Sequence, residues 1–352
     1  MNPGFWNGKR VLVTGHTGFK GSWLSLLLQA LGARVTGLAL EPATSPALFS
    51  EAQLAAVMDS RIGDINIPGV VSKAMAESQP QVILHLAAQA IVSESYANPL
   101  QTLQTNVMGT AMVLDAARRQ PGLGCIVVVT TDKCYENREW PWGYREDDAL
   151  GGKDIYSGSK ACAEVVTAAY RSSFFHDGDA PVIATARAGN VIGGGDWSAD
   201  RLLPDMMRAF MDAKPALIRS PSSVRPWQHV LEPLAGYLRL AECCVTSREF
   251  GQAWNFGPEL ADAAPVSEVA DRVVRLWGGD AAWQGGDGNP VRESHTLRLD
   301  SSKARLQLGW RPVTDLATAL ELTVGWYRRR ANGEHPAQIT RGQIAQYLAE
   351  LA

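Results

Sequence analysis

Several features that mark particular classes of protein are scarce in this sequence. It has five cysteines in 352 residues, none of them in a CxxC pair, and an odd number cannot all pair within one chain. Free thiols are typical of the reducing cytoplasm, where we expect this protein to reside. The net charge of −3 leaves no general basic surface, so we expect no nucleic-acid partner.

Long apolar runs are also missing. Stretches such as residues 23–31 are too short to cross a bilayer, and the start MNPGFWNGKR has no apolar signal region. We therefore expect no membrane association, and we also expect no bound metal. The one basic run, residues 328–330, falls at the end of an expected helix, where it complements the helix dipole.

What is present is an ordinary globular composition, with 46% hydrophobic and 20% charged residues, and a length that suits two domains. Strand and helix patterns alternate through the first half and become less regular in the second. This order predicts an α/β fold with a doubly wound parallel sheet of the Rossmann type. We expect a dinucleotide-binding domain over residues 1–192 and a smaller, mixed substrate domain over 193–352, some of whose elements return to the first.

The expected elements follow from apolar periodicity. Strands are predicted at residues 10–14, 34–40, 61–65, 81–88 and 181–192 and from 125 onward, and helices at 22–31, 97–119 and 156–174. The second half is predicted to hold helices at 201–213, 232–245, 267–277 and 314–330, with short strands at 216–219 and 224–230.

Three glycines, Gly15, Gly18 and Gly21, separate the first strand from the first helix. Glycines in such a turn let the backbone approach a pyrophosphate, which then lies on the helix N-terminus. The triplet alone is a weak indication, because 33 glycines make chance spacings common, but its place between strand and helix strengthens it. The cofactor-binding candidates are Gly15, Thr17, Gly18, Phe19, Lys20, Gly21, Asp64, Ile65, Leu86, Ala87, Ala88, Gln89, Tyr156 and Lys160.

The choice between NAD and NADP is less secure. An acidic residue normally closes the second strand and holds the adenosine ribose, and Glu41 stands near that point with Pro42 after it. His16 and Lys20 could serve either cofactor. Asp64, at the end of the third strand, could accept a hydrogen bond from the adenine amino group.

The stretch CIVVVTTDKCY, residues 125–135, carries the main chemical candidates. Its continuous β-branched run is typical of a strand buried on both faces, and Thr131, Asp132 and Lys133 follow at the carboxyl end. Ligands bind at that end of an open α/β sheet. A solvated loop that begins early is the plain alternative, since a carboxylate and an amine are costly to bury unless they are paired or used.

Tyr156 and Lys160 open the helix that follows, and residues four apart share one helical face. Their spacing also occurs by chance, and a surface helix with a buried tyrosine would explain it equally well. The position after the polar strand end favours function. Arg219, Arg225 and Arg292 are candidates for binding an anionic ligand, although each taken alone is more often a surface salt-bridge residue.

With these residues in order, the chain resembles the extended short-chain dehydrogenase/reductases that act on nucleotide sugars, over nearly its whole length. Within them it is similar to the CDP-glucose 4,6-dehydratase branch. The glycine turn and the Tyr156/Lys160 pair identify only the superfamily, whereas Lys133 separates this branch from dTDP-glucose dehydratases, which carry Asp-Glu there. The similar stretches are VTGHTGFKGSWLS, HLAAQ, NVMGT, TDKCYENREWPWGYRE, RAGNVIGGGDW, RPWQHVLEPL and WNFGP.

The resemblance implies roles for the candidates. Tyr156 would deprotonate the sugar 4-hydroxyl, with Thr131 orienting that hydroxyl. The ammonium of Lys160 and the positive nicotinamide ring would both favour phenolate and so lower the phenol pKa. Lys133 would be the base at C5 and protonated Asp132 the acid at the 6-hydroxyl. Lys160 would also contact the nicotinamide ribose. Asn190, Arg219, Arg225 and Arg292 would hold the nucleotide diphosphate, and NAD would be retained and regenerated in each cycle.

The implied activity is conversion of CDP-D-glucose to CDP-4-dehydro-6-deoxy-D-glucose, an early step toward deoxysugars of cell-surface polysaccharide. The alternatives are a related dehydratase or 4-epimerase using a dTDP-, GDP- or UDP-hexose, and a cofactor-sensing regulator that does no chemistry. A homodimer or homotetramer would pair the helices at 97–119 and 156–175. Residues 136–140 would shape the sugar pocket, without individual roles assigned.

Overall fold

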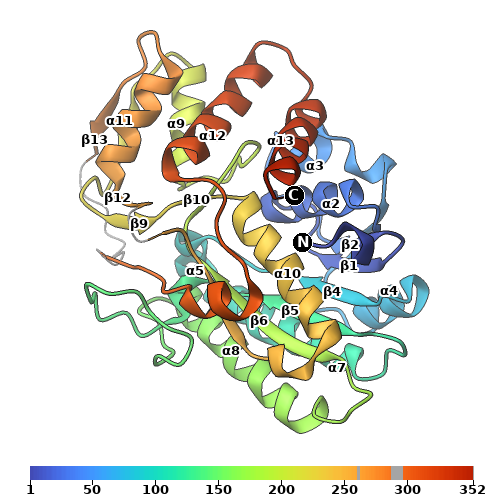
Figure 1. The fold of residues 1–352 in the computed structure, drawn as a ribbon. Coiled ribbons are helices and arrows are strands. Elements are labelled where there is room, and N and C mark those ends of the chain that lie inside the picture. Colours follow the sequence, from blue (N-terminus) through green and yellow to red (C-terminus); the bar gives the residue numbers. More distant parts are fainter. Residues whose placement is uncertain (260–261, 287–295, 352) are drawn as a thin grey trace.

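A single parallel sheet organises the molecule. The computed structural model describes residues 1–259, 262–286 and 296–351. Its seven strands run in the order β11-β6-β5-β4-β1-β2-β3, and every neighbouring pair is parallel (Figure 1). The strands are β1 (Arg10–Thr14), β2 (Arg34–Ala39), β3 (Asp59–Ile62), β4 (Val82–His85), β5 (Cys125–Val129), β6 (Val182–Ala188) and β11 (Ala253–Phe256).

Both faces of this sheet are buried, which explains the unbroken apolar runs in its central strands. Alternate side chains of one strand pack into different cores, so Cys125 and Val127 face one layer and Ile126 and Val128 the other. The first layer contains α2 (Phe19–Ala30) and α10 (Leu231–Thr246); the second contains α4 (Val70–Ser78), α7 (Gly109–Ala117) and α8 (Ile155–Phe174). The expected α/β fold of the Rossmann type is confirmed.

The helix expected at 97–119 is interrupted. Helix α5 (Val92–Ala97) ends before Asn98, α6 (Pro99–Leu103) begins at a proline, and a π-helical turn η2 (Gln104–Met108) precedes α7. Pro99 cannot donate a backbone hydrogen bond, which fits a helix start but not a continuation. Buried Asn106 lies in the π turn, and its side chain bonds to neighbouring segments. The helix start at Pro99 after Asn98 can be predicted from the sequence, whereas apolar spacing misses the π-helical turn.

Residues beyond 192 complete the sheet. Strand β11 pairs with β6, with Trp254 opposite Ala186, and α10 covers the sheet beside β5 and β6. The strand expected at 181–192 is divided into β6 and the short β7 (Val191–Ile192), and Gly189 and Asn190 between them belong to neither strand. Strand β3 also differs from its expected range of 61–65.

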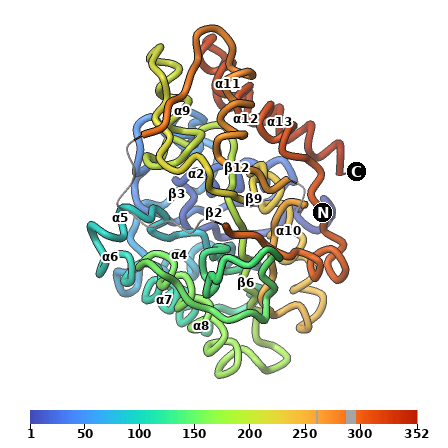
Figure 2. The backbone as a smooth tube through the Cα atoms, turned by 90° about the vertical axis from the view of Figure 1, so that its left-hand side faces the viewer, coloured from blue at the N-terminus to red at the C-terminus, as the bar shows by residue number. Residues whose placement is uncertain are grey.

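Among the remaining elements, the helices over residues 202–211, 266–277 and 316–331 gather at one end of the molecule, at the top of Figure 2. Three two-stranded sheets link segments far apart in the chain: β7 with β10 (Gln228–His229), β9 (Val224–Pro226) with β12 (Ala263–Pro265), and β8 (Ala216–Ile218) with β13 (Trp283–Gly285). The other helices are α1 (Pro3–Trp6), α3 (Leu48–Glu51), α9 (Leu202–Met211), α11 (Val266–Trp277), α12 (Leu316–Ala331) and α13 (Pro336–Leu351).

Candidate active site

The glycine-rich turn between β1 and α2 is built so closely that side chains would not fit. A Cβ on Gly21 would lie 2.0 Å from the carbonyl oxygen of Gly15, and one on Gly15 would lie 2.8 Å from the amide nitrogen of Ala87. Gly15 also has φ of +78°, which favours glycine. Gly18 is the exposed N-cap of α2 and supplies no side-chain acceptor for the first amides of the helix, which have no partner within the helix itself. This turn fits a dinucleotide diphosphate.

Some of the other predicted cofactor residues lie against the glycine turn, whereas the side chain of Gln89 bonds to its own surroundings. Leu86, Ala87 and Ala88 follow the end of β4, and the backbone of Leu86 and Ala87 lies against Gly15 of the turn. Thr17 donates a hydrogen bond to the carbonyl of Leu40 at 2.8 Å, which fixes the turn against the end of β2. The side chain of Gln89 is used locally, because it bonds to Thr102 at 2.9 Å and to the backbone of Ile91.

Asp64 does not close a strand. Strand β3 ends at Ile62, and the Asp64 carboxylate accepts hydrogen bonds from the backbone and side chain of Asn66, at 2.8 and 3.0 Å. This is an Asx turn, in which a short acidic side chain organises its own backbone. The neighbouring Ile65 is buried in the core against Gly109.

The polar end of β5 folds into a short 3-10 turn, η3 (Asp132–Cys134). Thr131 is its N-cap: its Oγ1 accepts a hydrogen bond from the amide of Lys133 at 3.3 Å and donates one to Asp132 Oδ1 at 3.1 Å. Thr131 and Asp132 are buried, with 7% and 2% of their surface exposed, while Lys133 is half-buried. The stretch is therefore an ordered turn, and the alternative of a solvated loop is wrong.

Helix α8 brings Tyr156 and Lys160 to the same place. Asp154 caps the helix, because its two carboxylate oxygens accept hydrogen bonds from the amide and hydroxyl of Ser157, at 2.9 and 2.7 Å. One turn later, Lys160 Nζ donates to the carbonyl oxygen of Val129 at 3.2 Å. The Tyr156/Lys160 pair thus lies directly against the end of β5.

The turn and the helix form one electrostatic cluster around Asp132. Burial raises the pKa of the Asp132 carboxyl, and this outweighs the opposing effects of Lys133, the Thr131 hydrogen bond, Arg225 and Lys20. Its Oδ2 has no hydrogen-bond partner among the described residues. A buried carboxyl that favours its protonated form is suited to donating a proton to a ligand.

Burial also sets the ionisation of the tyrosine. It raises the pKa of Tyr156 to about 12, although a hydrogen bond with Thr131 and the charge of Arg201 act in the opposite direction. The expected lowering by the Lys160 ammonium together with the positive nicotinamide ring concerns the protein with its cofactor bound, and it stays a prediction. The phenol is therefore protonated at neutral pH until a ligand changes its surroundings.

Arg201 and Asp196 belong to this cluster, and neither was predicted from the sequence. Arg201 immediately precedes α9 and forms an ion pair with buried Asp196 at 3.1 Å. The charges of Arg201 and Lys160 help burial to lower the pKa of Lys20 to about 7. In the sequence, the one indication that Asp196 belongs to a site is that it directly follows three consecutive glycines.

The predicted substrate residues fare differently. Arg225 is buried, and its charge acts on Asp132, which places it beside the cluster. Asn190 follows Gly189, at which a Cβ would lie 3.1 Å from Asp132 Oδ2. Arg219 instead pairs with Asp200 at 2.7 Å on a partly exposed surface. Arg292 lies outside the described residues.

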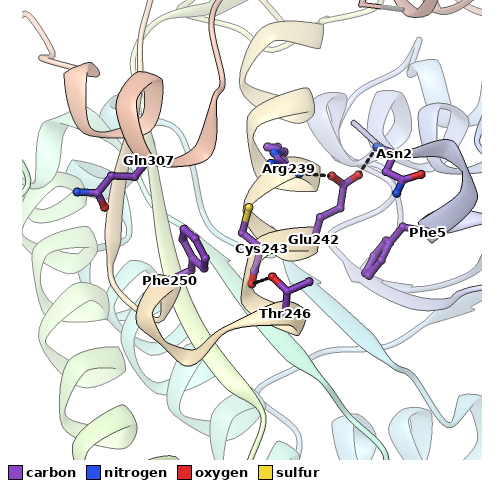
Figure 3. A pocket seen from close by; sticks show the side chains of 8 residues that line it. All are labelled: Asn2, Phe5, Arg239, Glu242, Cys243, Thr246, Phe250 and Gln307. Carbon is purple, nitrogen blue, oxygen red and sulfur yellow. Dashed lines mark hydrogen bonds and ion pairs between the residues drawn. The ribbon is translucent and has the colours of Figure 1, made fainter.

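A separate hollow lies between the N-terminal segment, α10 and the segment around Gln307 (Figure 3). Its volume is about 320 Å³, and Glu242 in its wall accepts a hydrogen bond from the backbone amide of Asn2 at 2.7 Å and one from Arg239 at 3.1 Å. On α10, Ala241 lies between the lining residues Arg239 and Glu242, and its carbonyl accepts a hydrogen bond from Sγ of Cys125, the first residue of β5. This hollow therefore belongs to the amino edge, away from the cluster.

Two further observations concern other kinds of site. Within residues 1–259, 262–286 and 296–351, no cluster of three or more histidine, cysteine, aspartate or glutamate side chains is arranged to hold a metal ion. None of the helices in these ranges combines the length and apolar character needed to cross a membrane.

Comparison with known proteins gives consistent relatives. The model of the NAD-dependent epimerase/dehydratase family matches residues 11–257. The chain is 46% identical over 354 residues to a CDP-glucose 4,6-dehydratase of Salmonella typhimurium, and the match covers 99% of both chains. It is 30% identical to a dTDP-glucose 4,6-dehydratase of Streptomyces griseus, with 93% of this chain and 96% of the relative covered.

Solved structures share the fold at lower identity. An epimerase from Methanothermobacter thermautotrophicus has a TM-score of 0.80 and 24% identity, covering 93% of this chain and 94% of its own. A dTDP-glucose 4,6-dehydratase from Streptomyces venezuelae, solved with NAD bound, has a TM-score of 0.76 and 24% identity, covering 93% and 99%. These likenesses establish the common architecture.

Proposed function

Because the chain belongs to the NAD-dependent epimerase/dehydratase family, we propose that it is a 4,6-dehydratase that removes water from CDP-glucose. The observation that carries this proposal is the ordered turn Thr131–Asp132–Lys133 against the Tyr156/Lys160 pair. An epimerase needs only a base at the 4-hydroxyl. A dehydratase also needs an acid and a second base, and this turn supplies both.

The cofactor would lie across the sheet edge, with its diphosphate on the turn formed by Gly15, Gly18 and Gly21. When bound, NAD would supply reversible hydride transfer at the sugar, from C4 and later back to C6, so that no net oxidation would occur. The second part of the chain, residues 193–352, would mainly hold the nucleotide. Arg225 and Arg201 are its best-placed cations, because both act on the catalytic cluster.

The side chains then divide the proton transfers. Tyr156 removes the proton of the 4-hydroxyl, which Thr131 orients, and the resulting 4-ketone acidifies the proton at C5. Neutral Lys133 removes that C5 proton, and the 6-hydroxyl leaves as water with a proton from Asp132. Burial already favours protonated Asp132, which is the state this step requires.

The identity of the nucleotide is tested directly. The purified protein is incubated separately with the CDP, dTDP, UDP and GDP derivatives of the hexose. We expect a 4-keto-6-deoxy product and release of water only from CDP-glucose. A keto product from another nucleotide alone would overturn the base specificity, and inversion at C4 without loss of water would overturn the reaction.

We infer that the protein works as a homodimer or a homotetramer. Two segments beside the active site expose apolar side chains, among them Tyr96 and Leu100 before α7 and Val165 on α8, with 50%, 80% and 57% of their surface exposed. Pairing of these helices with a second copy would cover them. Sedimentation of the protein and of a Val165→Glu variant checks this. The added charge should weaken a dimer that pairs through these helices and should leave a dimer held elsewhere unchanged.

The setting we propose is the bacterial cytoplasm, where the 4-keto product would enter deoxysugar synthesis for a cell-surface polysaccharide. The five cysteines are all free thiols, which suits a reducing compartment. Fractionation of cells that express the protein tests the location.

A further inference from the structure

A buried ion pair lies beneath the catalytic turn. Arg187 Nη2, on β6, is 2.9 Å from Glu164 Oε2, on α8, and each side chain has only 3% of its surface exposed. Burial opposes ionisation of Glu164, but the charge and hydrogen bonds of Arg187 hold the pKa of its carboxyl below the usual value. A pair of this kind is costly to bury, so its further contacts indicate what it does.

The carboxylate of Glu164 binds Thr130, which lies between the end of β5 and the turn. Thr130 Oγ1 donates to Glu164 Oε1 at 2.5 Å, while the backbone amide of Thr130 still pairs with Ala186 of β6 at 2.9 Å. The other carboxylate oxygen accepts a hydrogen bond from Thr185 Oγ1 at 2.7 Å. Thr130 is thus the last residue fixed before the active residues begin.

The guanidinium of Arg187 holds the other end of the same turn. Its Nη1 donates to the hydroxyl of Tyr135 at 2.8 Å and to the carbonyl of Glu146 at 2.9 Å. The Tyr135 hydroxyl in turn donates to Asn255 Oδ1 at 2.7 Å, on β11. Tyr135 directly follows η3 and is 1% exposed, so its position is determined by buried partners.

We propose that Glu164 and Arg187 are positioning residues, whose ion pair fixes both ends of the turn that carries Asp132 and Lys133. The proposal rests on the proposed dehydratase function. Tyr156 and Lys160 are placed by α8 itself, whereas Asp132 and Lys133 depend on the residues on either side of them. The turn also carries Thr131, so oxidation at C4 uses one group of the turn and elimination uses two, Asp132 and Lys133. Loosening the turn should therefore slow the elimination of water more than the oxidation at C4.

Two variants loosen the turn without removing either charge. Tyr135→Phe deletes the hydroxyl that Arg187 holds, and Thr130→Val deletes the hydroxyl that Glu164 holds. Thr185→Val is the matched control, because it deletes an equivalent hydroxyl bonded to the same carboxylate from β6, outside the turn. Each protein is mixed with CDP-glucose and NAD, and both the absorbance of reduced nicotinamide and the release of water are followed.

For Tyr135→Phe we expect water release to fall about tenfold or more while reduced nicotinamide accumulates on the protein. Thr130→Val should change the same ratio in the same direction, and Thr185→Val should leave it at the wild-type value. Thermal unfolding of all three shows which variants are folded. The shared direction of the two turn variants separates positioning from a general loss of stability.

Two results would overturn the inference. Either both turn variants keep the wild-type ratio of oxidation to elimination, or the Thr185→Val control changes it as much as they do. A wild-type protein that releases no water from any nucleotide sugar is a different failure. It would overturn the proposed function, and the positioning role with it.

Discussion

Lys160 donates a hydrogen bond from Nζ to the carbonyl oxygen of Val129 at 3.2 Å, which joins the catalytic helix to the end of the central strand. Burial lowers the pKa of Lys160 to about 8, so at neutral pH the ammonium is still the main form. Tyr156, one turn earlier, has its pKa raised to about 12. Without a ligand, Lys160 and Tyr156 are therefore both protonated at neutral pH. A ligand must lower the pKa of the Tyr156 phenol before it can act as a base.

Replacing Tyr156 with phenylalanine removes that base. We expect turnover of CDP-glucose to fall by about 10²–10⁴-fold, the usual contribution of a positioned acid–base group. NAD binding, measured by calorimetry, should stay close to wild type, because we assign the cofactor's diphosphate to the glycine turn and not to Tyr156. Tyr170→Phe, a change to a half-buried tyrosine on the same helix, is the control. Unchanged turnover in Tyr156→Phe would contradict the assigned role.

Replacing Lys133 with alanine should separate the two halves of the reaction. Elimination should drop by roughly 10²–10⁴-fold because the base at C5 is lost, while oxidation at C4 continues. Reduced nicotinamide should then be detectable on the protein after mixing with substrate. Lys153→Ala, at an exposed lysine near the start of α8, should behave as wild type. If water release persists in Lys133→Ala, another group is the C5 base.

Asp132→Asn should make the protein more stable at neutral pH although it is inactive. Burial raises the folded-state pKa of Asp132, so the folded protein holds this proton to higher pH than the unfolded chain, whose aspartates titrate near about 3.9. The carboxyl contributes its full stability below that value, and the contribution is lost as pH rises through the folded-state pKa.

Asparagine does not titrate, so the variant avoids this loss. Urea unfolding should show a gain on the order of 1 kcal/mol at about pH 7 that shrinks toward pH 4. The exposed Asp179 offers a control, since Asp179→Asn should stay within about 0.5 kcal/mol of wild type. A gain that is constant over this pH range would show that the charge of Asp132 is not its cause.

Replacing one partner of the buried Glu164–Arg187 ion pair should lower the free energy of unfolding much more than the net effect of replacing both partners together. Glu164→Gln or Arg187→Met alone leaves one charge without its partner and should lower the free energy of unfolding by about 3–5 kcal/mol. The double variant should lose clearly less than the sum, because neither charge remains. The exposed pair Arg272–Glu268, at 2.6 Å on α11, should be worth at most about 0.5 kcal/mol in the same cycle. Additive losses at Glu164 and Arg187 would contradict the coupling.

Much of the fold and the centre of the site could be predicted, because they depend on local patterns. Alternate burial makes a run such as residues 125–129 recognisable, and the order of strands and helices then places Thr131 at the ligand edge. Asp154 and the 3.6-residue period bring Tyr156 and Lys160 onto one face. Each of these inferences needs only neighbours in the chain.

What could not be predicted depends on partners far apart in the sequence. Arg187 lies within an apolar strand, so it needed a buried counter-charge, but only the structure identifies Glu164. Arg201 contacts Asp196 through a loop with no periodic pattern. Asp64 was assigned to a strand end, yet its carboxylate organises a turn, because a short acidic side chain competes with regular backbone pairing.

The return of β11 to the sheet has a consequence for synthesis on the ribosome. Until residues 253–256 have been translated and released from the exit tunnel, β6 is an edge strand with unpaired backbone groups along one side. Such edges pair with other nascent chains and promote aggregation. The first 192 residues, although they contain the glycine turn and the Tyr156/Lys160 pair, would therefore make a poor truncated product. Completion of the seven-stranded sheet is a late event in the production of this chain.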